Sequence, residues 1–157
     1  IENVDQLEIV YQYSCYPPSG KRGVGFSRTN LFGKNFDSYK KEAQRTFIVP
    51  MIESQKGIEN IDQILQLKFI DAIMVGPYDL SASIGVTGRF EDKKFKKNLK
   101  QILSLCSKNN VACGLHVVKP EIKQLDKAIK EGYQFLAYAG DAFFLNEFAT
   151  NPISKEK

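Results

Sequence analysis

The sequence predicts an α/β fold, in which parallel strands alternate with helices along the chain. Four short apolar runs occur along the 157 residues, and each is followed by a segment whose apolar residues recur at helical spacing. Such alternation is typical of a parallel sheet covered by helices. Four consecutive units make half of a (β/α)₈ barrel or, as the alternative, a smaller doubly wound sheet. No internal repeat or low-complexity tract divides the chain, so we predict a single domain over residues 1–157.

The composition is that of a water-soluble globular protein, with 43% hydrophobic and 25% charged residues and a mild net charge of +4. No apolar run approaches the roughly 18 residues that a membrane-spanning helix needs, so a membrane is not expected as a partner. The cysteines Cys15, Cys106 and Cys113 include no C-x-x-C pair and no metal-ligand spacing. This favours buried, reduced thiols and a cytoplasmic location.

The chain opens with a predicted helix within residues 2–18, in which Val4, Leu7 and Val10 fall on one side and the two prolines at the end stop the helix. No strand precedes this helix, although a helix of an α/β protein needs a sheet to cover. The first residue is Ile1 rather than Met. Together these features predict a fragment or a processed product.

A basic, glycine-rich loop follows over residues 19–33. Its cations Lys21, Arg22 and Arg28 could meet an anionic ligand together with backbone N–H groups. The spacing matches neither a P-loop nor a G-x-G-x-x-G motif that opens a helix. A subunit contact or a plain surface loop is therefore an equal alternative. A short helix is predicted over residues 37–44.

Two apolar runs in the middle of the chain each lead to a carboxylate. Residues 47–52 form the first predicted strand, which Glu53 follows, and a helix is predicted to start at Gly57.

The second run, residues 70–75, is predicted to be a buried strand that Gly76 and Pro77 stop, with Asp79 in the loop beyond. Carboxylates just past buried parallel strands are where α/β enzymes place their chemistry. For Asp79 the alternative is a simple cap of the following helix.

The second half of the chain carries a lysine-rich helix, predicted over residues 93–110, whose apolar stripe includes Phe95, Leu99 and Ile102. Its lysines lie largely on the other face without interleaved aromatic residues, so we predict a solvated surface and no nucleic-acid partner. The remaining predicted elements are a strand over 111–118, a helix ending at Gly132 that packs through Ile122, Leu125 and Ile129, a strand over 133–141, a final helix over 141–150 and a frayed tail over 151–157.

Glu53 and Asp79 lie one β-α repeat apart, so they are predicted to emerge at the same end of adjacent parallel strands. Two hard oxygen donors, completed by water and a chelating substrate, suit Mg²⁺ or Mn²⁺. Zinc is disfavoured because the chain has one histidine and no cysteine placed to pair with it. A paired-carboxylate glycosidase is disfavoured by the absence of tryptophan as a sugar platform.

His116 lies in the third predicted strand, within the stretch GLHVV. It could face the same strand-end site as the two carboxylates. The favoured interpretation is a structural one, a histidine held by a hydrogen bond inside the fold.

The segments YPPSGKRGVG, VPMIES, GPYDLSASIG, CGLHVV and FLAYAGDAFFL occur in the order and spacing of the HpcH/HpaI aldolase/citrate lyase family. The chain resembles most closely its class II pyruvate aldolases, such as 4-hydroxy-2-oxoheptanedioate aldolase and 2-keto-3-deoxy sugar-acid aldolases. The resemblance covers nearly the whole chain and implies the C-terminal half of a (β/α)₈ TIM barrel. It also favours a functional role for Asp79 over simple capping.

The resemblance implies a carbon–carbon lyase that cleaves a 4-hydroxy-2-oxo acid to pyruvate and an aldehyde, with Mg²⁺, Mn²⁺ or Co²⁺ as cofactor. Glu53 and Asp79 match the metal ligands. Backbone N–H groups at Tyr78 and Asp79 would hold the pyruvate carboxylate, and Gly76 and Pro77 would shape the loop. Arg22 matches the family's basic loop near the site and the subunit interface. The expected assembly is a homo-oligomer, commonly a hexamer.

Two departures limit what the resemblance transfers. Met51 stands where family members often carry glutamine, which removes hydrogen bonds near the substrate. The family's catalytic arginine and histidine belong to the N-terminal half of the barrel, and Arg22, Arg28 and His116 do not match them. We therefore expect residues 1–157 alone to have little activity. The alternatives are a citrate-lyase-like enzyme acting on CoA thioesters and a non-catalytic half-barrel that binds a ligand.

Overall fold

A computed structural model, which describes residues 1–149, contains one parallel sheet of four strands in sequential order. The strands are β1 (Met51–Ile52), β2 (Ala72–Val75), β3 (Ala112–Val117) and β4 (Phe135–Tyr138). Because crossover connections are right-handed, parallel strands in sequential order carry their connecting helices on one face. A doubly wound sheet needs a reversal of strand order. The sheet is therefore an arc of a barrel, and the predicted α/β class is confirmed.

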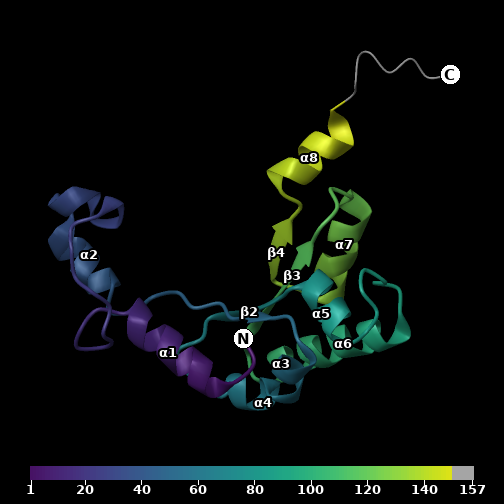
Figure 1. Ribbon diagram of the computed structural model, residues 1–157, viewed down its shortest axis with the longest axis horizontal. Helices are drawn as coiled ribbons and strands as arrows, with labels where there is room; N and C mark the ends of the chain where they lie inside the picture. The colour runs from purple at the N-terminus through teal and green to yellow at the C-terminus, as the bar shows by residue number, and fades with distance from the viewer. Residues whose placement is uncertain (150–157) are drawn as a thin grey trace.

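Helices cover one side of this arc (Figure 1). The N-terminus lies beside the sheet, where the Ile1 ammonium group donates to the Met51 carbonyl at 2.9 Å. The helices are α1 (Val4–Ser14), α2 (Phe36–Glu42), α3 (Gln55–Glu59), α4 (Ile61–Ile64), α5 (Pro77–Ser83), α6 (Lys93–Lys108), α7 (Ile122–Glu131) and α8 (Asp141–Phe148), with a 3₁₀ helix, η1, at Arg28–Gly33. The segment with η1 and α2 lies beyond α1, at the opposite end of the molecule from α5 and α6.

The hydrophobic core lies between the sheet and these helices. Alternate strand residues point into it, because successive side chains of a strand face opposite sides. Ile52, Ile73, Val75, Cys113 and Val117 belong to the core cluster and are at most 4% exposed. The helices contribute Ile61, Ile64, Leu80, Phe95, Ile102 and Cys106 to the same cluster.

The other face of the sheet is open. Met51, Met74, Gly114 and Phe135 lie side by side across the four strands in the observed register. Met51 is 43% exposed and Phe135 is 42% exposed, although both are large apolar side chains. This is the face that a closed barrel turns inward and fills with layers of side chains.

The first two predicted strands are longer than the observed ones. Ile48, within the expected strand 47–52, donates its N–H to the Asp71 carboxylate Oδ2 at 2.8 Å, and its carbonyl oxygen accepts the Asp71 backbone N–H at 2.9 Å. The predicted start of a helix at Gly57 is wrong by two residues: Ser54 caps α3 by accepting a hydrogen bond from the Gly57 N–H at 3.1 Å, so the helix begins at Gln55.

The second half of the chain follows the predicted order of elements. All three cysteines are buried and free, as expected. A hydrogen bond with Cys106 and burial raise the pKa of Cys113, which keeps that thiol neutral. The predicted packing of α7 is wrong in part: Ile122 and Ile129 are exposed, and the helix packs through Leu125 and Ala128. The predicted tail over 151–157 lies outside the described residues.

Gly114 is a point where two strands approach closely. A Cβ placed there would lie 2.8 Å from the Phe135 carbonyl oxygen and 3.0 Å from the Ile73 carbonyl oxygen. We therefore expect Gly114→Ala to lower the free energy of unfolding by about 1–3 kcal/mol, because neither strand can move aside freely. Thermal denaturation of the full-length protein measures this. Gly23→Ala is the control, since no atom lies within 4 Å of its Cβ position; equal melting temperatures for both variants would contradict the prediction.

Candidate metal and substrate site

Glu53 and Gly76 are neighbours at the carboxyl ends of β1 and β2. Ile52 pairs with Val75 in the register of the two strands. Glu53 directly follows Ile52, and Gly76 directly follows Val75. A Cβ on Gly76 would lie 3.1 Å from the Glu53 carboxylate Oε2 and 3.2 Å from the Met51 sulfur. The Glu53 side chain therefore lies over the end of β2, in the space that the glycine leaves free.

Asp79 lies in the first turn of α5, not in a loop as the sequence analysis predicted. Pro77 is the first helical residue and Gly76 occupies the N-cap position, with no side-chain capping bond. The simple capping role considered for Asp79 is therefore not the one observed. The helix ladder starts with the Leu80 N–H, which donates to the Gly76 carbonyl at 3.0 Å. The start of the helix leaves the N–H groups of Tyr78 and Asp79 without intrahelical acceptors.

Helix α5 is held in place by a buried serine. The Ser81 hydroxyl donates to the Tyr78 carbonyl at 2.7 Å and accepts from the Gly88 N–H at 2.9 Å. The Tyr78 ring packs edge-on against Phe90, with the ring centroids 4.9 Å apart. The turn that carries Tyr78 and Asp79 is thus fixed from both sides.

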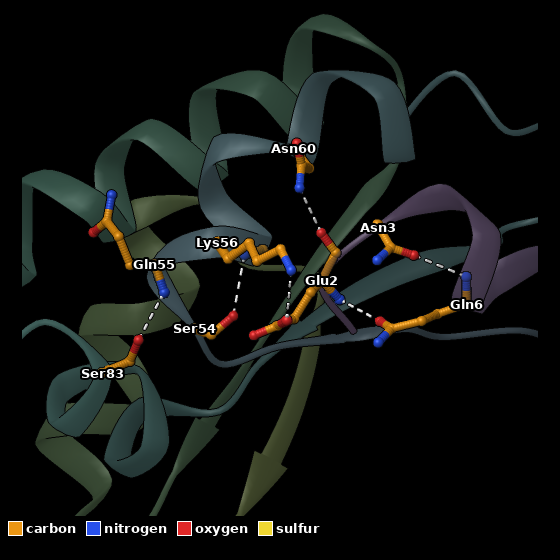
Figure 2. A network of polar contacts seen from close by, with 9 residues as sticks. Glu2, Asn3, Gln6, Ser54, Gln55, Lys56, Asn60 and Ser83 are labelled. Carbon is orange, nitrogen blue, oxygen red and sulfur yellow. Dashed lines mark hydrogen bonds and ion pairs between the residues drawn. The ribbon is translucent and has the colours of Figure 1, made fainter.

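A second contact joins the two segments that carry the carboxylates. The Gln55 N–H, two residues after Glu53, donates to the Ser83 hydroxyl of α5 at 2.8 Å, as Figure 2 shows. In the same network the Asn60 amide donates to the Glu2 carbonyl at 2.8 Å. The first bond ties the segment after β1 to the helix after β2, and the second ties the end of α3 to the N-terminal segment. The hydrogen bond between Gln55 and Ser83 joins residues far apart in the chain, so no local sequence pattern predicts it.

His116 lies on the open face of the sheet, the same face as Gly76. Cys113 and Val117 of β3 face the core, so Gly114 and His116 face the other way. The ring is half-buried, and Nε2 lies 3.2 Å from the Ala139 carbonyl oxygen. The predicted hydrogen bond within the fold is therefore also present.

Arg22 is not brought to Glu53 and Asp79 within the described part of the chain. Its guanidinium lies over the rings of Tyr16 and Tyr39, at 5.0 and 5.6 Å from their centroids. The pKa of Tyr39 is lowered, first by a hydrogen bond with the Thr29 side chain and then by Arg22. Arg22 thus orders the segment with η1 and α2, and its role toward substrate stays a prediction.

Glu53 and Asp79 fit a hard divalent cation. Within residues 1–149 no group of three or more His, Cys, Asp or Glu side chains could enclose a metal. A cation at these two carboxylates would take its remaining ligands from water and substrate, as Mg²⁺ commonly does. Zinc in a structural site needs four protein ligands, which this site does not supply.

A cavity of about 490 Å³ lies at the carboxyl ends of β2 and β3, next to the start of α5, and neither Glu53 nor Asp79 lines it. Its walls combine aromatic residues with charged residues at the rim. Among the lining residues are Pro77, Tyr78, Phe90, His116, Lys119 and Lys127. The sequence analysis identified Pro77, Tyr78 and His116 but not Phe90, which lies in a loop of small residues.

Comparison with known proteins identifies the family of the chain. The family model for HpcH/HpaI aldolase/citrate lyase matches residues 1–147. The chain belongs to the HpcH/HpaI aldolase/citrate lyase family. Solved structures of this family align along almost the whole chain. A family member from Burkholderia cenocepacia J2315 has a TM-score of 0.85 at 25% identity, covering 94% of this chain and 58% of its own. An HpcH/HpaI aldolase from Desulfitobacterium hafniense DCB-2 has a TM-score of 0.81 at 25% identity, and the match covers 94% of this chain and 57% of that aldolase.

Among curated proteins, the HpcH/HpaI chain is similar to 5-keto-4-deoxy-D-glucarate aldolase of Escherichia coli O9:H4 (strain HS), at 30% identity over 142 residues. That match covers 90% of this chain and 55% of the relative, so the chain spans about half the length of the curated relatives it matches. The resemblance stated from the motifs is confirmed, as is the barrel fold class. Residues 1–149 contain no helix that could cross a membrane.

Proposed function

We propose that this chain is part of a divalent-metal-dependent aldolase that cleaves a 4-hydroxy-2-oxo acid to pyruvate and an aldehyde. The observation that carries the proposal is the placement of Glu53 over Gly76, beside the first turn of α5 that presents Asp79. The similarity to 5-keto-4-deoxy-D-glucarate aldolase supports a hydroxylated oxo acid as the substrate class.

In this proposal, Glu53 and Asp79 hold Mg²⁺, Mn²⁺ or Co²⁺. When bound, the cation acts as a Lewis acid for the negative charge that develops on the keto oxygen of pyruvate. The N–H groups of Tyr78 and Asp79 bind the pyruvate carboxylate, which suits their position at a helix start. Gly76, which has no side chain, and Pro77, which fixes the turn, let the substrate approach the backbone.

The partners are proposals as well. They are pyruvate, as the small oxo acid, and further copies of the chain in a homo-oligomer, commonly a hexamer, with a cytoplasmic location. Arg22 would act near the site at a subunit interface, because its guanidinium packs on Tyr39 of α2, a helix that lies away from the sheet (Figure 1).

The test is a retro-aldol assay of the full-length protein with Mg²⁺ or Mn²⁺, coupled to pyruvate detection. We expect pyruvate release from 4-hydroxy-2-oxo acids, 5-keto-4-deoxy-D-glucarate among them, and loss of release with EDTA. Failure across a broad panel of such acids would refute the aldolase. Activity restricted to CoA thioesters would indicate the citrate-lyase-like alternative.

Residues 1–157 expressed alone are expected to have little or no activity. The open inner face of the sheet, with Met51 and Phe135 exposed, needs the rest of a barrel or a second copy to cover it. Comparison of the isolated segment with the full-length protein in the same assay measures this. Equal turnover by both would show that residues 1–157 hold every catalytic group.

A further inference from the structure

We propose that His116 determines the choice of aldehyde, by accepting a hydrogen bond at Nδ1 from a hydroxyl group on the aldehyde-derived part of the substrate. The inference rests on the proposed aldolase function and deepens it. It assigns a substrate contact to β3, on the opposite side of Gly76 from Glu53, and it names hydroxylated aldehydes as the preferred class.

The register places His116 beside the site. Met74 pairs with Met51 on one side and with Gly114 on the other, and Gly76 and His116 each lie two residues further along their strands. Glu53, Gly76 and His116 therefore form one row across three adjacent strands, on the same face of the sheet. With strands about 4.8 Å apart, the Cα atoms of Glu53 and His116 are separated by about 10 Å. A small molecule over Gly76 fits between them.

The hydrogen bond to Ala139 fixes which nitrogen of the ring is free. A carbonyl oxygen only accepts hydrogen bonds, so Nε2 carries the proton that is donated across 3.2 Å to the Ala139 oxygen. Ala139 has a left-handed φ of 52° and its N–H donates to the Val117 carbonyl at 2.8 Å, which anchors this acceptor. In the neutral ring Nδ1 then carries a lone pair. It makes no hydrogen bond within residues 1–149.

The His116 side chain is half-buried and lines the cavity at the carboxyl ends of β2 and β3. The residue paired with His116 on β4 is Ala137, whose methyl group covers little of an imidazole. On the far side of Gly76, Met51 presents its sulfur to the same space. The space over Gly76 therefore has a polar side chain, His116, on its β3 side and an apolar side chain, Met51, on its β1 side.

The lone pair decides the class of ligand. An acceptor pairs with a hydroxyl, which donates, and it repels a carboxylate oxygen, which also only accepts. His116 takes no part in bond making. In the addition direction the C3 carbon of pyruvate, after loss of a proton, attacks the aldehyde carbon; the new C–C bond forms and the former carbonyl oxygen takes up a proton. His116 only holds a hydroxyl next to that carbon in place.

The test uses the full-length protein with Mg²⁺ and pyruvate, and compares addition to glyceraldehyde with addition to propanal, which has the same carbon chain without the hydroxyls. For His116→Leu we expect kcat/KM for glyceraldehyde to fall about tenfold, while that for propanal changes less than about twofold. His116→Asn places an amide oxygen close to the position of Nδ1, so it is expected to recover most of the glyceraldehyde activity. Equal losses for the two aldehydes, or no loss for either, would overturn the proposal.

A second readout separates this inference from the proposed function. Exchange of the pyruvate C3 protons with D₂O needs no aldehyde, and His116→Leu should leave its rate unchanged. If the variant loses exchange as well, His116 acts on the fold rather than on specificity. If the wild-type protein performs neither exchange nor addition, the aldolase proposal itself fails and the inference with it. Exchange with unaltered selectivity in His116→Leu would overturn the inference alone.

Discussion

Replacement of Glu53 by Gln or of Asp79 by Asn is expected to weaken Mn²⁺ binding by at least about a hundredfold and to abolish pyruvate release. Removal of a group that only orients a metal ligand typically lowers metal affinity by about 10–100-fold. Removal of the charge on a ligand itself should lower the affinity by at least as much. Within residues 1–149 no group of three or more His, Cys, Asp or Glu side chains could hold the cation, so a third such ligand is not available to replace a lost carboxylate. Both amides keep the shape of the side chain and remove one negative charge each, so the loss reports charge and coordination rather than packing.

Titration of the full-length protein with Mn²⁺, followed by electron paramagnetic resonance, measures the affinity directly and does not depend on turnover. Asp62→Asn is the matched control, because Asp62 is an exposed carboxylate on α4, in the same β-α unit but away from the strand ends. If both site variants bind Mn²⁺ as tightly as the wild type, the metal site is wrong and a non-catalytic half-barrel gains support.

The sequence was enough to predict that Glu53 and Asp79 follow neighbouring strands. That inference needs only the count of β-α units and the rule that parallel strands point the same way. For His116 the sequence left two positions open, and one of them was the face of the sheet on which the side chain is found. Alternation of side chains along β3 allows that position. The barrel class followed from the resemblance, and the sequential strand order later excluded the doubly wound alternative.

The boundaries were harder to predict, because side chains far apart in the sequence decide them. The Ile48 N–H donates to the Asp71 side chain instead of to a backbone carbonyl, and α3 starts at Gln55 because Ser54 caps it and Ser83 accepts the Gln55 N–H. Periodicity in a single segment does not contain that information. It also overestimates burial where an element is at the edge of the sheet, as for Ile122.

Gly76→Ala is expected to reduce kcat/KM for retro-aldol cleavage by about a hundredfold while leaving the fold intact. The added methyl group would lie 3.1 Å from both the Cβ and the Oε2 of Glu53, and 3.2 Å from the Met51 sulfur. These neighbours are side chains that can move, so the strain is relieved by displacing the Glu53 carboxylate and not by opening the sheet. A misplacement of about 1 Å in a catalytic arrangement is enough to cost about a hundredfold in rate.

The matched control is Gly140→Ala, since Gly140 follows β4 as Gly76 follows β2, and a Cβ there meets only the Phe143 ring at an ordinary 3.8 Å. Mn²⁺ affinity should fall in Gly76→Ala together with the rate, and the melting temperature should change little. Loss of stability comparable to that of Gly114→Ala would instead mean that Gly76 is needed for strand packing. Unchanged rate and Mn²⁺ affinity would mean that Glu53 can bind the metal from another position. The close approach of Glu53 to the end of β2 would then not be needed for the site.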